Sequence, residues 1–83
     1  MTDEEEIQDA ITEAISAEKI IVKNPMKDGL HFEAIVVSEE FIGKSLIIQH
    51  QMVMDPLKPL FGSNLHALSL KTYTPNKWRE SNE

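Results

Sequence analysis

The apolar residues of the first segment recur with the period of an α-helix. Between residues 7 and 15, isoleucine and alanine stand at i, i+3, i+4, i+7 and i+8, which places them in one stripe. Thr2 and Glu5 have the spacing of a capping box, and the acidic residues of the first turn suit the positive end of the helix dipole. The pattern predicts an amphipathic helix that ends near Ser16.

Two runs rich in β-branched residues follow. Residues 19–23 and 31–37 are separated by Pro25 and Gly29, residue types that are typical of a tight reversal, so the two runs are expected to form an antiparallel hairpin. A third strand is expected over residues 64–73. Alternation along the strands predicts that each of two sets shares a face: Phe32, Ala34 and Val36, and then His66, Leu68 and Leu70.

Capping residues mark the remaining helices. Asp55 is a favourable N-cap and Pro56 a favourable first residue, so residues 44–61 are expected to form two successive helices divided at this point. Thr74 and Pro75 repeat the pattern at the start of a last helix. The apolar stripe of residues 44–61 consists of Leu46, Ile47, His50, Val53, Met54 and Leu57.

The predicted elements have the order α-β-β-α-α-β-α, and Ser38 caps one further helical turn that ends at Phe41. Trp78 is expected to anchor the last helix on the body. No linker or repeat interrupts this order, and 83 residues allow one domain only. Residues 1–83 are therefore expected to form a single α+β domain.

The composition excludes several kinds of chemistry. The chain has no cysteine, which rules out disulfides, a thiol nucleophile and an iron–sulfur cluster that this chain holds alone. No apolar run approaches the roughly 20 residues of a membrane span. The acidic start is unlike a secretory or transit signal. The cytoplasm is the expected location, and no membrane partner is expected.

The net charge of −6 is unevenly distributed. Residues 1–18 contain seven acidic and no basic residues, whereas residues 19–83 contain eight basic and seven acidic residues. We expect the acidic residues to form a solvated helix face. Because non-specific binding to nucleic acid depends on Lys and Arg that neutralise phosphates, the nearly neutral body predicts weak binding to DNA.

The sequence offers no support for an enzyme. Gly43-Lys44-Ser45 is similar to the end of a phosphate-binding P-loop, but Ser38 stands where that motif needs its first glycine. No G-x-S-x-G or comparable local signature of a nucleophile is present. We expect no catalytic residues.

The candidate metal ligands are the three histidines. They lack the spacing of a metal-binding pair, although one or two of them can complete a site whose other ligands come from a partner. His50 lies beside an apolar stripe and is expected to be packed and hydrogen bonded rather than a ligand. For His31, which follows a glycine turn, a ligand and an exposed bystander remain equally open.

Two blocks of the sequence resemble the BolA family. The first is LHFEAIVVSEEFIGKSL, residues 30–46, and the second is HALSLKTYTP, residues 66–75, followed by Trp78. Their order and separation match the family, and the resemblance covers nearly the whole chain. It implies a small α+β domain similar to the class II KH fold, with a three-stranded mixed sheet and helices packed on one face.

The resemblance also implies a partner. BolA-like proteins associate with monothiol glutaredoxins that carry a C-G-F-S site, and the pair holds a bridging 2Fe–2S cluster. Its ligands are the glutaredoxin cysteine, glutathione and histidine of the BolA-like chain. His66 opens the second block and is the implied first ligand. His31 stands beside Phe32, as in members with a D-G-x-H-F sequence, and is the second choice, while Asp28 occupies the position where many members carry the second ligand.

The chain is then expected to be an adaptor in cluster trafficking or iron homeostasis. Because protonation of imidazole competes with a metal, the bond from histidine should weaken at acidic pH. The last strand and helix form the expected docking surface, with Lys71, Thr72, Tyr73, Thr74, Pro75 and Trp78.

Two other functions remain. A DNA-binding transcriptional regulator of a stress or morphology response is permitted by the KH-like fold and by a helix-turn-helix-like pair within residues 44–61. The absence of a G-x-x-G loop and the presence of Gln49 and Gln51, where the family has arginines, weigh against it. The second of these functions is that of a stress-related protein that acts only through contacts with other proteins. Alone, the chain is expected to be a monomer or a weak homodimer through the face or the edge of its sheet.

Overall fold

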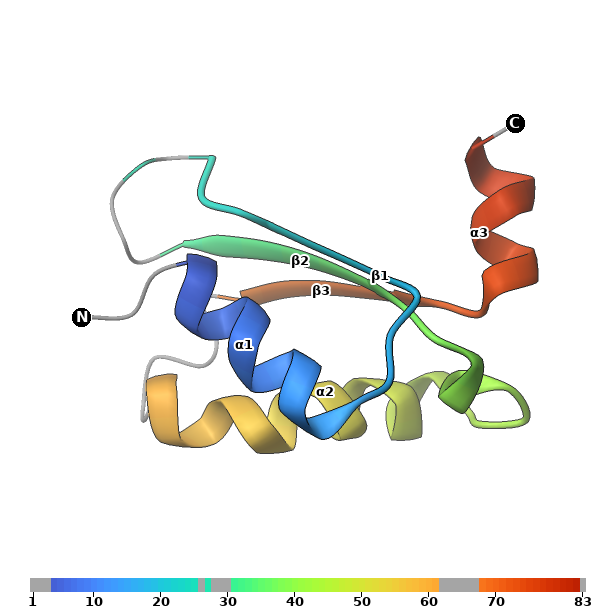
Figure 1. The fold of residues 1–83 in the computed structure, drawn as a ribbon, viewed down its shortest axis with the longest axis horizontal. Helices are drawn as coiled ribbons and strands as arrows, with labels where there is room; N and C mark the ends of the chain where they lie inside the picture. The colour runs from blue at the N-terminus through green and yellow to red at the C-terminus, as the bar shows by residue number, and fades with distance from the viewer. Residues whose placement is uncertain (1–3, 26, 28–30, 62–67, 83) are drawn as a thin grey trace.

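The computed structural model describes residues 4–25, 27, 31–61 and 68–82. The structure has the expected α+β class, and its elements follow the expected order except that one helix, α2, after the helical turn η1, replaces the two central helices (Figure 1). The elements are α1 (Glu4–Ala14), β1 (Lys19–Lys23), β2 (Phe32–Val37), η1 (Glu39–Phe41), α2 (Leu46–Phe61), β3 (Leu68–Tyr73) and α3 (Pro75–Asn82).

The three strands form a mixed sheet in the order β1-β2-β3. The expected hairpin is present, because β1 pairs antiparallel with β2, with Ile21 opposite Ile35. β3 pairs parallel with β2, from Phe32 opposite Leu68 to Val37 opposite Tyr73. The parallel pair places the N-terminal ends of β2 and β3 at one side of the molecule and η1 and α3 at the other.

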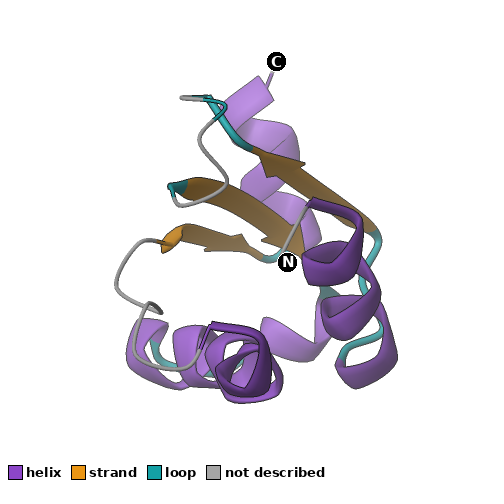
Figure 2. Ribbon diagram, turned by 90° about the vertical axis from the view of Figure 1, so that its left-hand side faces the viewer, coloured by secondary structure: helices purple, strands orange, loops and turns teal. Residues whose placement is uncertain are grey.

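The core lies between the sheet and two helices. As the alternation predicts, Phe32, Ala34 and Val36 all point inward and are at most 2% exposed. The stripe of α1 and the middle of α2 cover this face of the sheet (Figure 2). The other members of the core are Ile7, Ile11, Ile15, Phe41, Val53, Leu57 and Leu68. Among the described residues, no helix has the length and apolar character needed to cross a membrane.

The division of residues 44–61 into two helices is wrong. α2 continues through Pro56 and Pro59 as one helix of 16 residues. Val53 and Leu57 are both fully buried in the same core, and only an uninterrupted helix keeps these two positions, four residues apart, on one face. Their packing outweighs the cost of about 3 kcal/mol that a proline imposes on a helix interior.

The predicted apolar stripe of α2 is only partly buried. Leu46 is 61% exposed and Ile47 is 72% exposed, in contrast to Val53 and Leu57. The reason is the length of α2: its first turn extends past the end of α1, so that no second helix covers it (Figure 1).

The last helix lies on the other side of the sheet. α3 begins where predicted, at Pro75 after Thr74, and then turns away from α1 and α2 (Figure 2). The expected packing on one face therefore holds for α1 and α2 alone. Val37 points to the second face and is nevertheless fully buried, near the ring of Tyr73, against which Trp78 of α3 packs. Trp78 thus anchors α3, as the sequence predicts.

Candidate functional site

The first candidate region is the edge formed by the N-terminal ends of β2 and β3. Phe32 and Leu68 begin the parallel pair and are 2% and 8% exposed, so both anchor this edge in the core. His31 directly precedes Phe32 and is exposed. Because Phe32 is buried in the core, the backbone beside it is held in place, and the exposed His31 is attached at this point.

His66 and Asp28 lie outside the described residues. Leu68, two residues after His66 in the sequence, is the first described residue of β3.

This edge brings together few metal donors. Within the part of the chain that the structure describes, no group of three or more His, Asp or Glu side chains has the geometry to hold a metal ion. The imidazole of His31 can supply one ligand of a coordination sphere. Further ligands for a metal at this edge would have to come from residues other than those the structure describes or from a partner.

The second candidate region is the predicted docking surface on β3 and α3. Lys71 is exposed on the face of the sheet opposite the helical layer, next to Ile35 of β2. Tyr73 and Trp78 are half-buried, and their rings meet edge to face with centroids 5.4 Å apart. These three side chains form the accessible part of the predicted surface.

The other predicted docking residues have structural roles. Thr72 is only 9% exposed, and its hydroxyl donates a hydrogen bond of 2.7 Å to Oε1 of Gln49 on α2. Thr74 caps α3 by accepting a hydrogen bond of 3.4 Å from the backbone N–H of Lys77. Pro75 is buried as the first residue of the helix. Thr72 therefore shapes the surface from below rather than through direct contact.

Lys19 also belongs to this surface, although no sequence pattern indicates it. Its Nζ atom lies 5.6 Å from the centroid of the Trp78 ring, a distance typical of a cation–π contact. Lys19 begins β1 and Trp78 lies in the last helix, so only the sheet order brings them together. No local motif can reveal a pair so far apart in the sequence.

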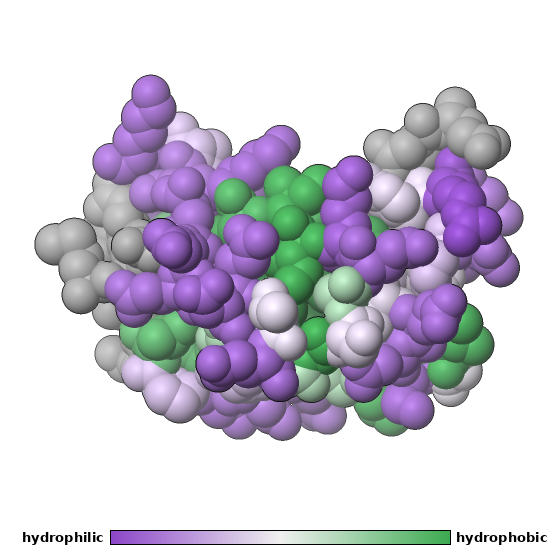
Figure 3. Space-filling model, viewed as in Figure 1, coloured by the Kyte–Doolittle hydropathy of each residue, from purple (hydrophilic) through white to green (hydrophobic). Residues whose placement is uncertain are grey.

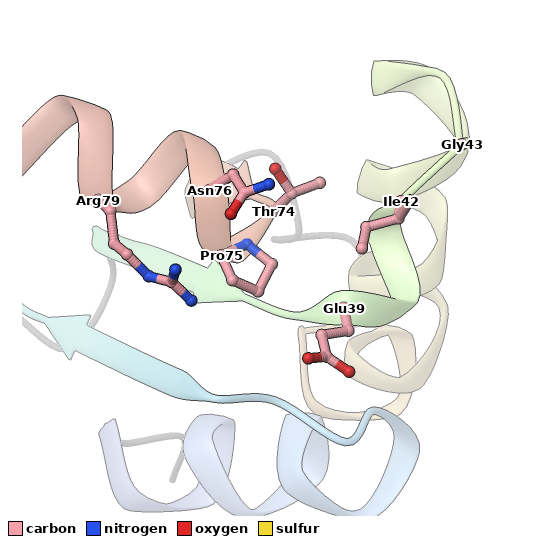
Figure 4. Close-up of a pocket in the computed structure, with 7 residues that line it drawn as sticks. All are labelled: Glu39, Ile42, Gly43, Thr74, Pro75, Asn76 and Arg79. Atoms are coloured by element: carbon pink, nitrogen blue, oxygen red, sulfur yellow. The ribbon is translucent and has the colours of Figure 1, made fainter.

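A pocket of about 370 Å³ lies beside the start of α3. Ile42 and Pro75 contribute apolar surface, and the side chains of Glu39 and Arg79 lie on either side of Pro75 (Figure 4). The two side chains carry opposite charges. The pocket gives the docking surface a concave part between η1 and α3.

Charge is separated across the molecule. The acidic residues of α1 are exposed, as expected for a solvated face. Lys19, Lys23 and Lys71 instead belong to the opposite face of the sheet, around the half-buried side chains of Ile21 and Ile35. Figure 3 shows apolar surface among polar side chains in the middle of the molecule, where the strands run.

His50 is packed, as the sequence predicts. The predicted hydrogen bond from its ring is not found among the described residues. The residue is half-buried on α2, and its Nε2 atom is buried without a hydrogen-bond partner among the described residues. The neighbouring Gln49 makes three side-chain hydrogen bonds. Besides accepting from Thr72, the Gln49 side chain donates to the carbonyl oxygens of Lys44, at 2.9 Å, and Phe41, at 3.3 Å.

The mixed sheet, with α1 and α2 on one face and α3 on the other, defines a small α+β fold. The family model described as BolA-like protein matches residues 11–77. The chain belongs to the BolA-like family, as its two sequence blocks predicted.

Named relatives agree with this assignment. The chain is 39% identical to the acid stress protein IbaG of Escherichia coli over 74 residues, which cover 88% of this chain and 84% of IbaG. It is 32% identical to the DNA-binding transcriptional regulator BolA of Vibrio cholerae, with coverage of 93% and 83%. The solution structure of BolA1 from Mus musculus superimposes with a TM-score of 0.82 at 30% identity and covers 96% of this chain and 71% of that one.

Proposed function

We propose that this chain is an adaptor that pairs with a monothiol glutaredoxin and contributes histidine to a shared 2Fe–2S cluster. The cluster is the cargo, for trafficking or iron homeostasis, and the chain holds it only together with the glutaredoxin and glutathione. The observation that carries the proposal is the parallel pairing of β2 with β3, because it aligns the two strands that follow His31 and His66.

The donor chemistry of this edge fits such a cluster. In a chain without cysteine, neutral imidazole is the available nitrogen ligand, and histidine replaces cysteine on one iron of some 2Fe–2S centres. Four ligands complete a 2Fe–2S cluster. We assign His66 as the first ligand from this chain and His31 as the second, which leaves two positions for the thiolates of the glutaredoxin and glutathione.

We assign the docking of the glutaredoxin to β3 and α3. Lys71, Tyr73 and Trp78 offer a cation and two aromatic rings there, and aromatic residues are enriched in protein interfaces. β3 runs from the histidine edge to this surface, so one partner that lies along β3 contacts both regions. Lys19, held over Trp78, adds a second cation.

The experiment is anaerobic cluster reconstitution of the purified chain with a C-G-F-S glutaredoxin and glutathione, followed by visible absorption and circular dichroism. The wild-type chain should give a heterodimer whose spectrum differs from that of the cluster-bridged glutaredoxin dimer. His66→Ala should return the spectrum to that of the glutaredoxin alone, and His31→Ala should alter it. Gln8→Ala, an exposed change on α1 away from β3 and α3, serves as the control and should behave as wild type.

The outcomes separate the ligands. If His31→Ala leaves the spectrum of the heterodimer unchanged, the second ligand is Asp28 or water, and Asp28→Asn decides between them. If the wild-type chain never changes the spectrum of the glutaredoxin, the adaptor proposal fails.

A DNA-binding regulator is the second candidate, favoured by the name of the Vibrio cholerae relative, DNA-binding transcriptional regulator BolA. The single helix α2 removes the helix-turn-helix-like pair on which this interpretation depended. Lys19, Lys23 and Lys71 remain as cations on the open face of the sheet. A salt titration with random duplex DNA tests it: tight binding with a steep salt dependence favours the regulator, and negligible affinity favours the adaptor.

A further inference from the structure

α3 is joined to the body of the molecule by few side chains. Of residues 75–81, Pro75 and Trp78 are the two that are not exposed. The cap at Thr74 is weak, because its hydroxyl lies 3.4 Å from the backbone nitrogen of Lys77, longer than an ordinary hydrogen bond. A helix of eight residues is marginal in water on its own. The position of α3 therefore depends on how the ring of Trp78 is held.

Trp78 contacts both edge strands of the sheet. Lys19 of β1, Val37 of β2 and Tyr73 of β3 stand opposite one another in one row on the face away from α1 and α2. The ring of Trp78 meets that of Tyr73 at 5.4 Å between centroids, and the Nζ atom of Lys19 lies 5.6 Å from the centroid of the Trp78 ring. β1 and β3 are roughly 10 Å apart, so one side chain of α3 joins the two edges. Val37, in the middle of the row, is fully buried.

We propose that Lys19 is a positioning residue for the docking surface. Its ammonium group holds the ring of Trp78 against the sheet and so raises the fraction of molecules in which α3 places Trp78 beside Lys71 and Tyr73. The effect on a partner rests on the proposed function, because this surface is the one assigned to the glutaredoxin. The attachment of α3 is a property of the chain alone.

The charge of Lys19 is available for this contact. Lys19 forms no ion pair with another residue that the structure describes. An ammonium group above an aromatic ring is attracted by the negative potential of the ring face. Because Lys19 is exposed, the contact should change the equilibrium between attached and detached α3 by roughly two- to fivefold.

Lys23 offers a matched comparison. It is exposed on the same strand and the same face as Lys19, but it stands opposite Glu33 at the other end of β1. Lys23→Met therefore removes the same charge from the same face at a distance from Trp78. If Lys19 were only one more surface charge, the two changes would have similar effects, whereas a positioning role predicts an effect of Lys19 alone.

The first measurement uses the chain without a partner. The exchange of the backbone amides of residues 79–81 with solvent is followed by NMR, under conditions in which the rate is proportional to the detached fraction of α3. Lys19→Met should raise these rates roughly two- to fivefold. Lys19→Arg should keep the wild-type rates, because a guanidinium group also binds the face of an aromatic ring. Lys23→Met should leave the rates unchanged.

The second measurement is the dissociation constant for a C-G-F-S glutaredoxin. A partner that binds only the attached form loses affinity by no more than the factor by which the attachment equilibrium changes. Lys19→Met should therefore weaken binding by no more than about fivefold, and it should have no further effect in a chain that already carries Trp78→Leu. Direct contact of Lys19 with the partner would instead weaken binding equally in both chains.

The outcomes separate this role from the proposed function. The positioning role is overturned by equal exchange rates in the wild type and Lys19→Met, by equal effects of Lys19→Met and Lys23→Met, or by equal weakening of binding with and without Trp78. If the exchange rates change as expected but the glutaredoxin does not bind the wild-type chain, the attachment of α3 by Lys19 stands and the proposed function fails.

Discussion

The hydrogen bond between Thr72 and Gln49 joins β3 to α2, and the effect of its loss can be worked out from the structure. Thr72 is 9% exposed, so its hydroxyl has little access to water if Gln49 is replaced. A buried group left without its partner costs about 1–3 kcal/mol. Gln49→Leu also removes the two bonds to the loop before α2. We expect it to lower the free energy of unfolding by about 2–3 kcal/mol.

The complementary change should be milder. Thr72→Val removes the hydroxyl but leaves the amide of Gln49, which is only half-buried and reaches water. Its expected cost is about 1 kcal/mol. In the double variant neither polar group remains unpaired, so its cost should be smaller than the sum of the two single changes by about 1 kcal/mol.

The assay is urea unfolding followed by the fluorescence of Trp78, the only tryptophan of the chain. Trp78 packs on Tyr73, the residue after Thr72, and so reports on the loss of this region. With a slope of about 1 kcal/mol per molar urea, Gln49→Leu should lower the midpoint by about 2–3 M. Strict additivity of the two changes, or a shift below about 0.5 M for Gln49→Leu, would refute the reasoning.

Three further predictions concern α2 and the loop before it. Pro56→Ala restores a backbone N–H inside a continuous helix and should raise the free energy of unfolding by about 1–2 kcal/mol in the same urea assay, whereas a helix that started at Pro56 would be destabilised. Gly43→Ala should cost about 1 kcal/mol, because Gly43 has a φ of 78° and a Cβ atom would meet nothing within 4 Å, so only backbone strain is added; Gly43→Asn should cost less. Leu57→Ala, at a fully buried position, should cost about 2–5 kcal/mol and leave a large unfolded fraction by far-UV circular dichroism at 37 °C; a change below about 1 kcal/mol would contradict its place in the core.

Local patterns were sufficient for the hairpin and for the caps at Ser38 and Thr74. The alternation of Phe32, Ala34 and Val36 predicts a half-buried strand because every second side chain must reach the same core. Ser38 caps η1 as predicted: its Oγ accepts from the backbone N–H of Glu40 at 3.0 Å and donates to the carbonyl oxygen of Ser16 at 2.9 Å. The first of these contacts spans two residues, which is why the sequence reveals it.

Tertiary packing decided what local patterns left open. Asp55 and Pro56 have the chemistry of a helix start, but the burial of Val53 and Leu57 requires a continuous helix. The side of the sheet taken by α3 depends on the direction in which β3 ends, a property of the sheet rather than of residues 74–78. For the candidate site, the sequence identified His31 at its exposed edge and the ring of Trp78, whereas Lys19 and Gln49 required the assembled fold.

The parallel pairing of β2 with β3 also has a consequence for folding kinetics. Phe32 and Leu68 are 36 positions apart along the chain, and every other pair in this register has the same separation. Such a contact forms only after a long loop has closed, whereas the β1–β2 hairpin joins neighbouring segments. During synthesis, β3 is also the last strand to leave the ribosome. The edge where β2 and β3 begin and the proposed docking surface are therefore completed in the final folding step, so a partly folded chain presents neither of them to a partner.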